Sequence, residues 1–308
     1  MTTALFTHPV CLEHDTGPGH PEQIARLRVI LEALTDERFA LLDRREAPMA
    51  GRDALIRAYH AAYVDQELAS IPKEGYAAVD PDTIVSPASG EAALRAAGGV
   101  IAAIDAVFAG EVSNAFCAVR PPGHHAEADR AMGFCLFNNV AVGAYHARAK
   151  HGISRVAVMD FDVHHGNGTQ HIFERDPDLF YASTHQMPLY PGTGDVSETG
   201  VGNIVNAPLP PMAGSGPFRA AMERIVIPAL DEFRPELLIV SAGFDAHAAD
   251  PLAQLMLGEA DYAWATDALV AVAERHCNGR LVSALEGGYD LPALARSAAT
   301  HVERLMAA

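Results

Sequence analysis

The sequence predicts a single α/β domain in which a parallel β-sheet is flanked by helices on both faces. Short apolar runs rich in β-branched and aromatic residues alternate with longer helical segments, the order expected when helices connect parallel strands. The runs are nearly continuously apolar, as in strands that are buried on both faces. No repeat, low-complexity tract or Ser/Gly linker divides the chain, so residues 1–308 are expected to form one domain.

The predicted elements follow from these runs in chain order. Each strand is a short, mostly apolar run, and the strands are expected at 4–8 (ALFTH), 115–119 (AFCAV), 155–161 (RVAVMDF), 179–184 (LFYAST), 236–242 (ELLIVSA) and 281–286 (LVSALE). The helices are expected in the intervening segments, many of them rich in Ala and Leu, at 21–34, 90–108, 138–151, 168–174, 217–233, 258–276 and 291–306.

Composition is typical of a soluble globular protein. The residues are 49% hydrophobic and 20% charged, and no apolar run reaches the roughly 18 residues that a membrane span needs. The N-terminus lacks the basic stretch and long apolar core of a secretory signal, so a cytoplasmic location is expected. The cysteines lie far apart and form no CxxC pair, which predicts reduced thiols rather than disulfides or a thiolate zinc site: Cys11, Cys117, Cys135 and Cys277.

The charge of the chain bears on its partners. A formal net charge of -17 argues against nucleic acid, because phosphate contacts require clustered Lys and Arg. An acidic protein attracts cationic ligands, but the same charge also serves solubility alone. Charge by itself leaves both interpretations open.

Polar side chains suited to catalysis follow several predicted strands. The carboxyl ends of parallel strands meet at one edge of the sheet, where ligands bind in proteins of this class. The residues concerned are His124 and His125 after the second strand, Asp160, Asp162, His164 and Asn167 around the end of the third, Asp245 after the fifth and Tyr289 after the sixth.

Three of these residues are suited to binding a metal ion. In an extended chain, Asp160, Asp162 and His164 lie on one face, because side chains alternate with a period of two. Asp162 and His164 could then bind one ion together with Asp245 from another strand. Two carboxylates and one imidazole leave a coordination position open for water and substrate, as in catalytic zinc sites, whereas structural sites use four protein ligands. The sequence therefore predicts a catalytic Zn²⁺ site, with Fe²⁺ as the alternative metal.

At these residues the sequence resembles the histone deacetylase family, within the arginase/deacetylase superfamily of α/β proteins. Asn167 stands where class I members carry Asp, so the chain is most similar to the class II-like bacterial deacetylases and acetylpolyamine amidohydrolases. The resemblance covers nearly the whole chain and rests on HDTGPGHPE at 14–22, RPPGHHAE at 120–127, MGFCLFNN at 132–139, DFDVHHGNGTQ at 160–170, PGTGD at 191–195, SAGFDAHAADPL at 241–252 and LEGGYDL at 285–291.

The resemblance implies a role for each matching catalytic residue. His125 matches the general base and acid, which takes a proton from water and later protonates the leaving amine. His124 is the partner imidazole and is tuned by Asp160, while His125 faces Asn167. A carboxylate favours the protonated ring and an amide does not, so the two histidines are expected to differ in protonation. Tyr289 matches the residue that donates its hydroxyl to the tetrahedral oxyanion.

Other matches concern the substrate and a second ion. Gly133, Phe134 and Tyr190 match the aromatic walls around an acyl-lysine stem, Leu252 matches a position at the channel rim, and Arg26 resembles an arginine that lines an internal acetate exit. The family also binds structural potassium, mainly through main-chain oxygens, and the resemblance places that ion at Asp160, Asp162, His164, Ser183 and Thr184.

The resemblance therefore implies a zinc-dependent amidohydrolase that removes acetyl or longer acyl groups from acyl-lysine or a similar cationic amide, with acetylpolyamine deacetylation as the alternative. A ureohydrolase with two manganese ions is a less favoured alternative, because it would need a second aspartate where Gly243 stands. A non-catalytic protein that binds acylated ligands would be expected to have lost a metal ligand, His125 or Tyr289, and all are present. Neither a nucleic-acid nor a membrane partner is expected, and the oligomeric state is left open.

Overall fold

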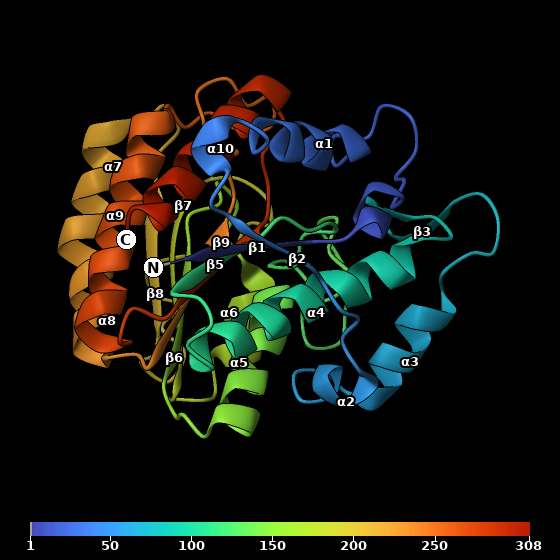
Figure 1. Ribbon diagram of the computed structural model, residues 1–308, viewed down its shortest axis with the longest axis horizontal. Helices are drawn as coiled ribbons and strands as arrows, with labels where there is room; N and C mark the ends of the chain where they lie inside the picture. The colour runs from blue at the N-terminus through green and yellow to red at the C-terminus, as the bar shows by residue number, and fades with distance from the viewer. Residues whose placement is uncertain (1) are drawn as a thin grey trace.

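The predicted parallel sheet forms the centre of the computed structural model, which describes residues 2–308 (Figure 1). The sheet has 8 strands, and every neighbouring pair in it is parallel. In spatial order the strands are β2 (Asp43–Glu46), β1 (Thr3–Thr7), β5 (Asn114–Cys117), β10 (Leu281–Leu285), β9 (Leu237–Ala242), β6 (Val156–Asp160), β7 (Leu179–Gln186) and β8 (Ile204–Leu209).

The six predicted strands all occur, with ends that shift by one or two residues. The two strands that the sequence did not indicate, β2 and β8, lie at the two edges of the sheet. β2 reads DRRE and β8 contains a proline, so neither has the apolar run of a strand buried on both faces. An antiparallel hairpin of β3 (Ala77–Asp80) and β4 (Thr83–Val85), outside the main sheet, was also not predicted.

Helices cover both faces of the sheet, as predicted (Figure 1). One layer contains α4, packed on α5, and the other contains α10, packed between α1 and α9. The α-helices are α1 (Ile24–Ala33), α2 (Arg52–Leu55), α3 (Ala61–Ala69), α4 (Ser89–Phe108), α5 (Asn139–His151), α6 (Asn167–Phe173), α7 (Ser215–Ala221), α8 (Ile227–Phe233), α9 (Glu259–His276) and α10 (Leu291–Met306). Two 3₁₀ turns occur at Pro9–Leu12 and Glu37–Phe39.

Two helix predictions need correction, and two short helices were not predicted. The helix expected from residue 21 begins at Ile24, after an irregular turn. The helix expected at 217–233 begins at Ser215 and is interrupted by a π-helical segment at Met222–Val226. The short helices α2 and α3 were not predicted, because neither is a long periodic segment; their few apolar side chains pack on a second, smaller cluster around Tyr59 and Phe137.

The apolar halves of the strands build the core and fix the site. Residues Val156–Met159 of β6 are fully buried between both helical layers, and each such side chain contributes about 1.5 to 3 kcal/mol through the hydrophobic effect. Register places Asp160 beside Ser183 of β7 and Ser241 of β9, so the carboxyl ends of the central strands lie level. Polar residues that follow these strands are therefore brought to one edge.

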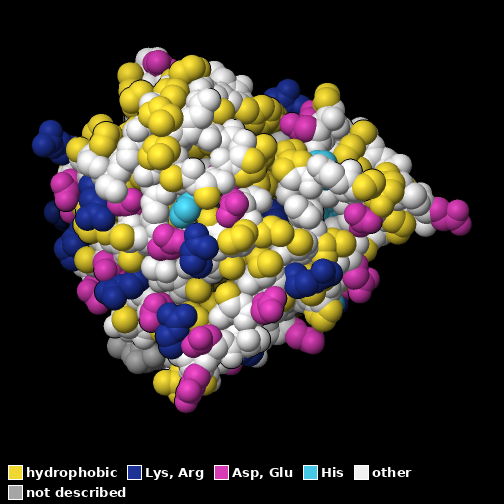
Figure 2. Space-filling view, turned by 90° about the horizontal axis from the view of Figure 1, so that it is seen from above, with side chains coloured by type: hydrophobic (Ala, Val, Ile, Leu, Met, Phe, Trp, Pro, Cys, Tyr) yellow, Lys and Arg dark blue, Asp and Glu magenta, His cyan; other side chains and the backbone are white. Residues whose placement is uncertain are grey.

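The surface is mixed in charge. On the face shown in Figure 2, acidic and basic side chains are interspersed with hydrophobic ones rather than gathered by sign. No helix within residues 2–308 combines the length and the apolar character needed to cross a membrane.

Candidate functional site

The polar residues after β6 are placed by two tight turns rather than by an extended strand. β6 ends at Asp160, and the backbone N–H of Asp162 then donates to Asp160 Oδ1 (3.0 Å). The N–H of His164 donates in the same way to Asp162 Oδ1 (2.9 Å). The expectation of an extended chain with one shared face is therefore wrong: Asp160 faces His124, whereas Asp162 and His164 face a different point.

That point is shared with Asp245, which follows β9. His164 Nδ1 lies 3.1 Å from both Asp162 Oδ1 and Asp245 Oδ2, and the three side chains are buried. The other oxygen of each carboxylate is already bound, since Gly287 N–H donates to Asp162 Oδ2 (2.7 Å) and Val163 N–H donates to Asp245 Oδ1 (2.8 Å). Asp162 Oδ1 also accepts from the His164 N–H, and its second lone pair is left for an ion. One oxygen of each carboxylate and one ring nitrogen lie within 4.8 Å of one another, which is a donor set that suits Zn²⁺ or Fe²⁺.

Two glycines leave no room for further ligands beside this group. A Cβ at Gly243 would lie 2.0 Å from Asp162 Oδ2, and one at Gly287 would lie 2.0 Å from Asp245 Oδ2. Position 243 is where a ureohydrolase with two metal ions would need its extra aspartate. Because even a methyl group there collides with Asp162, the geometry favours a single metal ion.

One other group of histidine and carboxylate lies apart from this edge. Asp105 Oδ1 is 2.8 Å from Nε2 of both His146 and His151, on the packed pair α4 and α5, and its other oxygen accepts from Lys150 (2.8 Å). The protein's own ammonium group thus already supplies a cation there, and the group is partly exposed.

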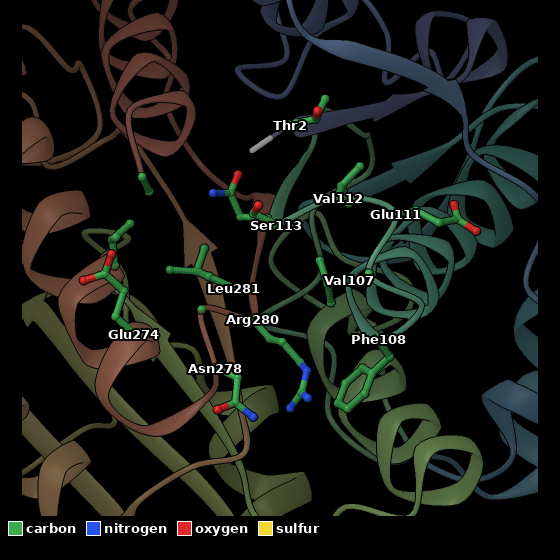
Figure 3. Close-up of a pocket in the computed structure, with 15 residues that line it drawn as sticks. Thr2, Val107, Phe108, Glu111, Val112, Ser113, Glu274, Asn278, Arg280 and Leu281 are labelled. Atoms are coloured by element: carbon green, nitrogen blue, oxygen red, sulfur yellow. The ribbon is translucent and has the colours of Figure 1, made fainter.

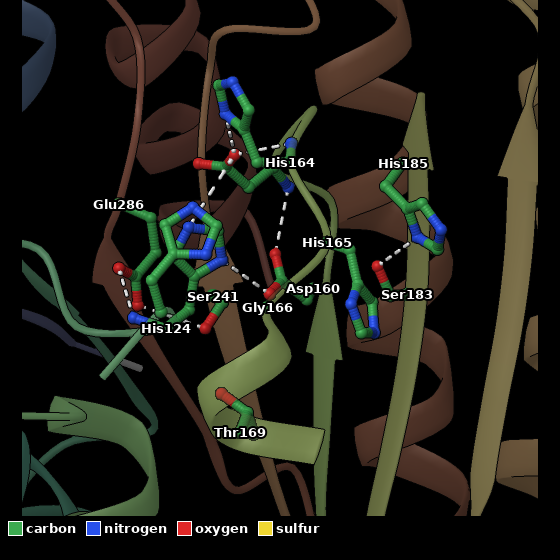
Figure 4. Close-up of polar contacts among 12 residues, drawn as sticks. His124, Asp160, His164, His165, Gly166, Thr169, Ser183, His185, Ser241 and Glu286 are labelled. Carbon is green, nitrogen blue, oxygen red and sulfur yellow. Dashed lines mark hydrogen bonds and ion pairs between the residues drawn. The ribbon is translucent and has the colours of Figure 1, made fainter. Parts of the chain in front are cut away.

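His124 is held by carboxylates. Its Nδ1 is 2.9 Å from Asp160 Oδ2 (Figure 4). Asp160 Oδ2 in turn accepts from the hydroxyl of Tyr181 (3.1 Å). Burial alone would lower the pKa of His124, but the carboxylates of Asp162, Asp160 and Glu286 hold that pKa well above its ordinary value. His124 is therefore expected to carry a proton on both nitrogens at neutral pH.

His125 is in the opposite state. Its Nδ1 is 2.8 Å from Asn167 Oδ1, and its ring stacks at an angle on His124 with centroids 4.0 Å apart. Burial lowers the pKa of His125 well below its ordinary value, and the charges of His124 and His164 lower it further. The predicted difference in protonation between the two histidines thus has a geometric basis, and His125 is neutral and able to accept a proton.

Glu286, the last residue of the LVSALE run, was not singled out from the sequence. Its Oε2 accepts from the backbone N–H groups of Gly123 (2.7 Å) and His124 (3.1 Å), and its Oε1 accepts from Ser241 (3.1 Å) (Figure 4). It therefore fixes the backbone at the tandem histidines. A carboxylate directly after a strand that is apolar except for Ser283 was the signal that could have identified it.

Tyr289 is positioned by its loop and by Arg26. The Tyr289 N–H donates to Asp250 Oδ2 (2.7 Å), and the Arg26 guanidinium lies 4.9 Å from the centre of the ring. Arg26 also donates to the carbonyl of Gly288 (2.6 Å) and pairs with buried Glu22 (2.9 Å). Burial raises the pKa of Tyr289 well above its ordinary value, so the hydroxyl keeps its proton and can donate it in a hydrogen bond.

A cavity of about 260 Å³ connects these groups to the surface. It contains all four residues predicted to contact the substrate, with Phe134 6.0 Å from Tyr289 and Tyr190 5.1 Å from His125 between ring centres. Gly133 adopts φ +58°, and a Cβ there would lie 2.5 Å from the His125 ring, so only glycine fits. The complete lining is Asp82, His125, Gly133, Phe134, His164, Leu189, Tyr190, Leu252 and Tyr289.

A larger cavity, of about 630 Å³, lies at the opposite end of the strands (Figure 3). Phe108, Val112 and Leu281 line it together with Arg280, and its described lining contains no histidine, cysteine or aspartate. Size alone would select this cavity, but Glu111 and Glu274 are its only acidic side chains and no histidine or metal-ligand group accompanies them in the described lining. The smaller cavity is the better candidate for chemistry.

Of the residues predicted to bind potassium, Asp160 and the pair Ser183 and Thr184 lie on the neighbouring strands β6 and β7, whereas Asp162 and His164 lie in the turns after β6. Asp160 pairs with Ser183 in the register of β6 and β7, next to Thr184. Thr184 Oγ1 is buried and has no hydrogen-bond partner among the described residues, whereas Ser183 Oγ lies 2.9 Å from His185 Nδ1. An unpaired buried oxygen is compatible with a cation nearby.

Comparisons with known proteins point to one family. The histone deacetylase domain matches residues 20–305. A histone deacetylase-like amidohydrolase from Pseudomonas aeruginosa is 43% identical over 93% of this chain and 81% of its own, and a probable deacetylase from Archaeoglobus fulgidus is 40% identical over 94% of this chain and 82% of its own. The crystal structure of the HDA15 HD domain matches with a TM-score of 0.94 and 35% identity, covering 99% of this chain and 88% of that chain.

Proposed function

Because this chain belongs to the histone deacetylase family of amide hydrolases, we propose that it is a zinc-dependent deacylase acting on acyl-lysine or a similar cationic amide. The observation that carries the proposal is the convergence of three different functions on one small cavity. His164, which belongs to the three-ligand metal group, lines this cavity together with His125 and Tyr289. That combination is what hydrolysis of an unactivated amide requires.

Asp162, His164 and Asp245 would hold the ion, and they supply three ligands rather than the four of a structural site. A Zn²⁺ or Fe²⁺ ion there would polarise the amide carbonyl and lower the pKa of a water molecule in the site. The backbone N–H groups of Val163 and Gly287 each hold one oxygen of Asp245 and Asp162, so the other oxygens of these carboxylates are oriented before any ion arrives.

The chain's own groups would carry the protons. His125, neutral in the resting state, takes the proton of the attacking water and later gives it to the leaving amine, a role worth about 100- to 10,000-fold in rate. The Tyr289 hydroxyl donates to the oxyanion as it forms. His124, held in its charged form by the carboxylates of Asp162 and Asp160, adds positive charge next to His125.

The cavity would bind the substrate through its narrow aromatic walls. Phe134 and Tyr190 would flank an unbranched methylene stem, and Leu252 lies at the partly exposed rim. Asp82 also lines this cavity, which places one of the chain's many acidic residues where a cationic or N–H-bearing substrate would enter. The same feature favours acetylpolyamines as the alternative substrate, because their second amine is charged.

We further propose one catalytic domain spanning residues 1–308 and a structural potassium ion bound at Asp160, Asp162, His164, Ser183 and Thr184. The unpaired Thr184 Oγ1 supports the potassium site. The cytoplasmic location stays a prediction from the sequence.

The test is a substrate panel measured on protein of known metal content. We expect kcat/KM to be highest for either acetyl-lysine peptides, longer acyl-lysines or acetylpolyamines, with about one Zn²⁺ or Fe²⁺ ion per chain at the predicted ligands. Full activity in a His125→Ala, Tyr289→Phe double variant would refute the mechanism. A metal-loaded protein that hydrolyses none of these amides would instead support a binding function.

A further inference from the structure

A second layer of polar contacts lies behind His125. Asn167, at the start of α6, places Oδ1 2.8 Å from His125 Nδ1 and donates from Nδ2 to Glu127 Oε1 (2.6 Å). Asn167 is only 6% exposed, so these contacts, with a weak one from Nδ2 to Met132 Sδ (3.4 Å), account for its amide. Asn167 therefore connects the imidazole to a carboxylate that has no other part in the proposed chemistry.

Glu127 is itself held in place. Its N–H donates to the carbonyl of Arg130 (2.9 Å), and its Oε2 accepts from the Arg130 guanidinium (2.9 Å). The side chain is 19% exposed, less than its partner at 57%. With Oε2 bound to Arg130, Oε1 is left to accept from Asn167.

The direction of the Asn167 amide decides which nitrogen of His125 carries the proton. The amide oxygen and nitrogen have nearly the same size, so shape does not select between the two orientations. With the oxygen towards His125, Nδ1 must carry hydrogen and Nε2 is free to accept a proton. With the nitrogen towards His125, the proton sits on Nε2 and the imidazole is no longer a base there.

We propose that Glu127 is a positioning residue that sets this direction. A carboxylate can only accept hydrogen bonds, so Glu127 requires the N–H₂ end of Asn167 and turns the oxygen towards His125. This inference rests on the proposed function, in which His125 is the base, and it names a residue that acts through Asn167 rather than on the substrate.

The same geometry explains why position 167 carries an amide. An aspartate there would place its second oxygen about where Asn167 Nδ2 lies, 2.6 Å from Glu127 Oε1. Two carboxylates at that distance cannot both stay ionised. Positions 127 and 167 are therefore coupled: an acceptor at 127 requires the amide, and a carboxylate at 167 would require a donor at 127.

The coupling gives a double-mutant test. Glu127→Lys replaces the acceptor by a donor and reverses the amide, so we expect kcat to fall about 100-fold or more with KM nearly unchanged; a wrong histidine tautomer costs about 10,000-fold in serine hydrolases. Asn167→Asp alone also lowers kcat. Combining the two substitutions restores a donor–acceptor pair. We therefore expect kcat of the double variant to be at least about tenfold higher than the value obtained by multiplying the two single effects.

Two further variants separate positioning from folding. Glu127→Gln keeps an acceptor oxygen, so it should retain kcat within about threefold. Glu37→Lys makes the same charge change on an exposed side chain in the 3₁₀ turn Glu37–Phe39 and should leave kcat unchanged. Thermal unfolding and metal content, measured on every variant, show whether a loss of kcat is accompanied by a loss of structure.

The ¹⁵N shifts of the His125 ring, assigned with a His125→Gln variant, report the tautomer without any substrate. We expect the Nδ1–H form in the original protein and in Glu127→Gln, and the Nε2–H form in Glu127→Lys. The proposal is overturned if all three proteins show the same His125 tautomer. It is also overturned if kcat of the double variant is no higher than the product of the two single effects predicts. If the original protein hydrolyses no amide, the proposed function is wrong. The tautomer measurement needs no substrate, so it still shows whether Glu127 orients Asn167.

Discussion

Replacing Tyr289 with phenylalanine separates catalysis from stability. The Tyr289 hydroxyl has no hydrogen-bond partner within residues 2–308, while the ring contacts Arg26 and Phe134. Tyr289→Phe keeps those ring contacts and leaves no buried group unpaired, so the free energy of unfolding should change by less than about 0.5 kcal/mol. Loss of the oxyanion donor should instead lower kcat about 100- to 1000-fold, equivalent to about 2.7 to 4 kcal/mol of transition-state stabilisation.

The assay combines steady-state kinetics on the best substrate of the panel with thermal unfolding and metal content. Tyr63→Phe is the matched control, because the Tyr63 hydroxyl donates to the Leu136 carbonyl (2.7 Å) in the smaller apolar cluster. Its removal should cost about 1 kcal/mol of stability and leave kcat unchanged. The assignment of Tyr289 fails if kcat of Tyr289→Phe stays within threefold of the original, or if its loss is matched by a loss of stability.

Three other changes test the metal group, a buried acid and the cavity wall. Replacing a residue that hydrogen-bonds to a metal ligand typically weakens metal binding about 10- to 100-fold, and Asp245→Asn, which replaces a ligand, should weaken zinc binding by more than that. Asp105→Asn should not alter the zinc content of dialysed protein. Burial raises the pKa of Glu67 from 4.5 to about 7, so the folded chain keeps this proton longer than the unfolded chain and loses stability as pH rises through that window. Glu67→Gln should therefore be more stable by about 1 to 3 kcal/mol at pH 8 and equal near pH 4 in urea unfolding; an equal effect at both values contradicts this. Gly133→Ala places a methyl group against the His125 ring. It should lower kcat more than about tenfold, because a displaced general base contributes less to the rate. Unchanged kinetics would show that the loop at residue 133 shifts to make room for the methyl group.

The central sheet was predictable because burial on both faces leaves a local signature. β6 and β9 are apolar at nearly every position, and an observer needs only these runs to expect parallel strands. The edge strand β2 is charged at every position and half of its side chains are exposed, so it has no such signature. Its pairing with β1 depends on the register of the neighbouring strand rather than on its own composition.

The candidate site was predictable to the extent that its residues follow strands. Asp162, His164, Asp245 and Tyr289 could be grouped because the carboxyl ends of parallel strands meet. Asp82 could not be placed, since it lies in a hairpin outside the main sheet, and its distance from the cavity depends on how that hairpin packs.

The sequence by itself determined which chemical groups are available and at which edge of the sheet they gather. It also predicted that His124 and His125 differ, because one matched a carboxylate partner and the other an amide. Only the tertiary structure decided what that amide does. Glu127, 40 positions from Asn167 along the chain, contacts it directly, so His125 is connected to a carboxylate after all, through Asn167. Hydrogen-bond direction and pKa depend on burial and on distances of a few ångströms, and neither is encoded in the spacing of residues along the chain.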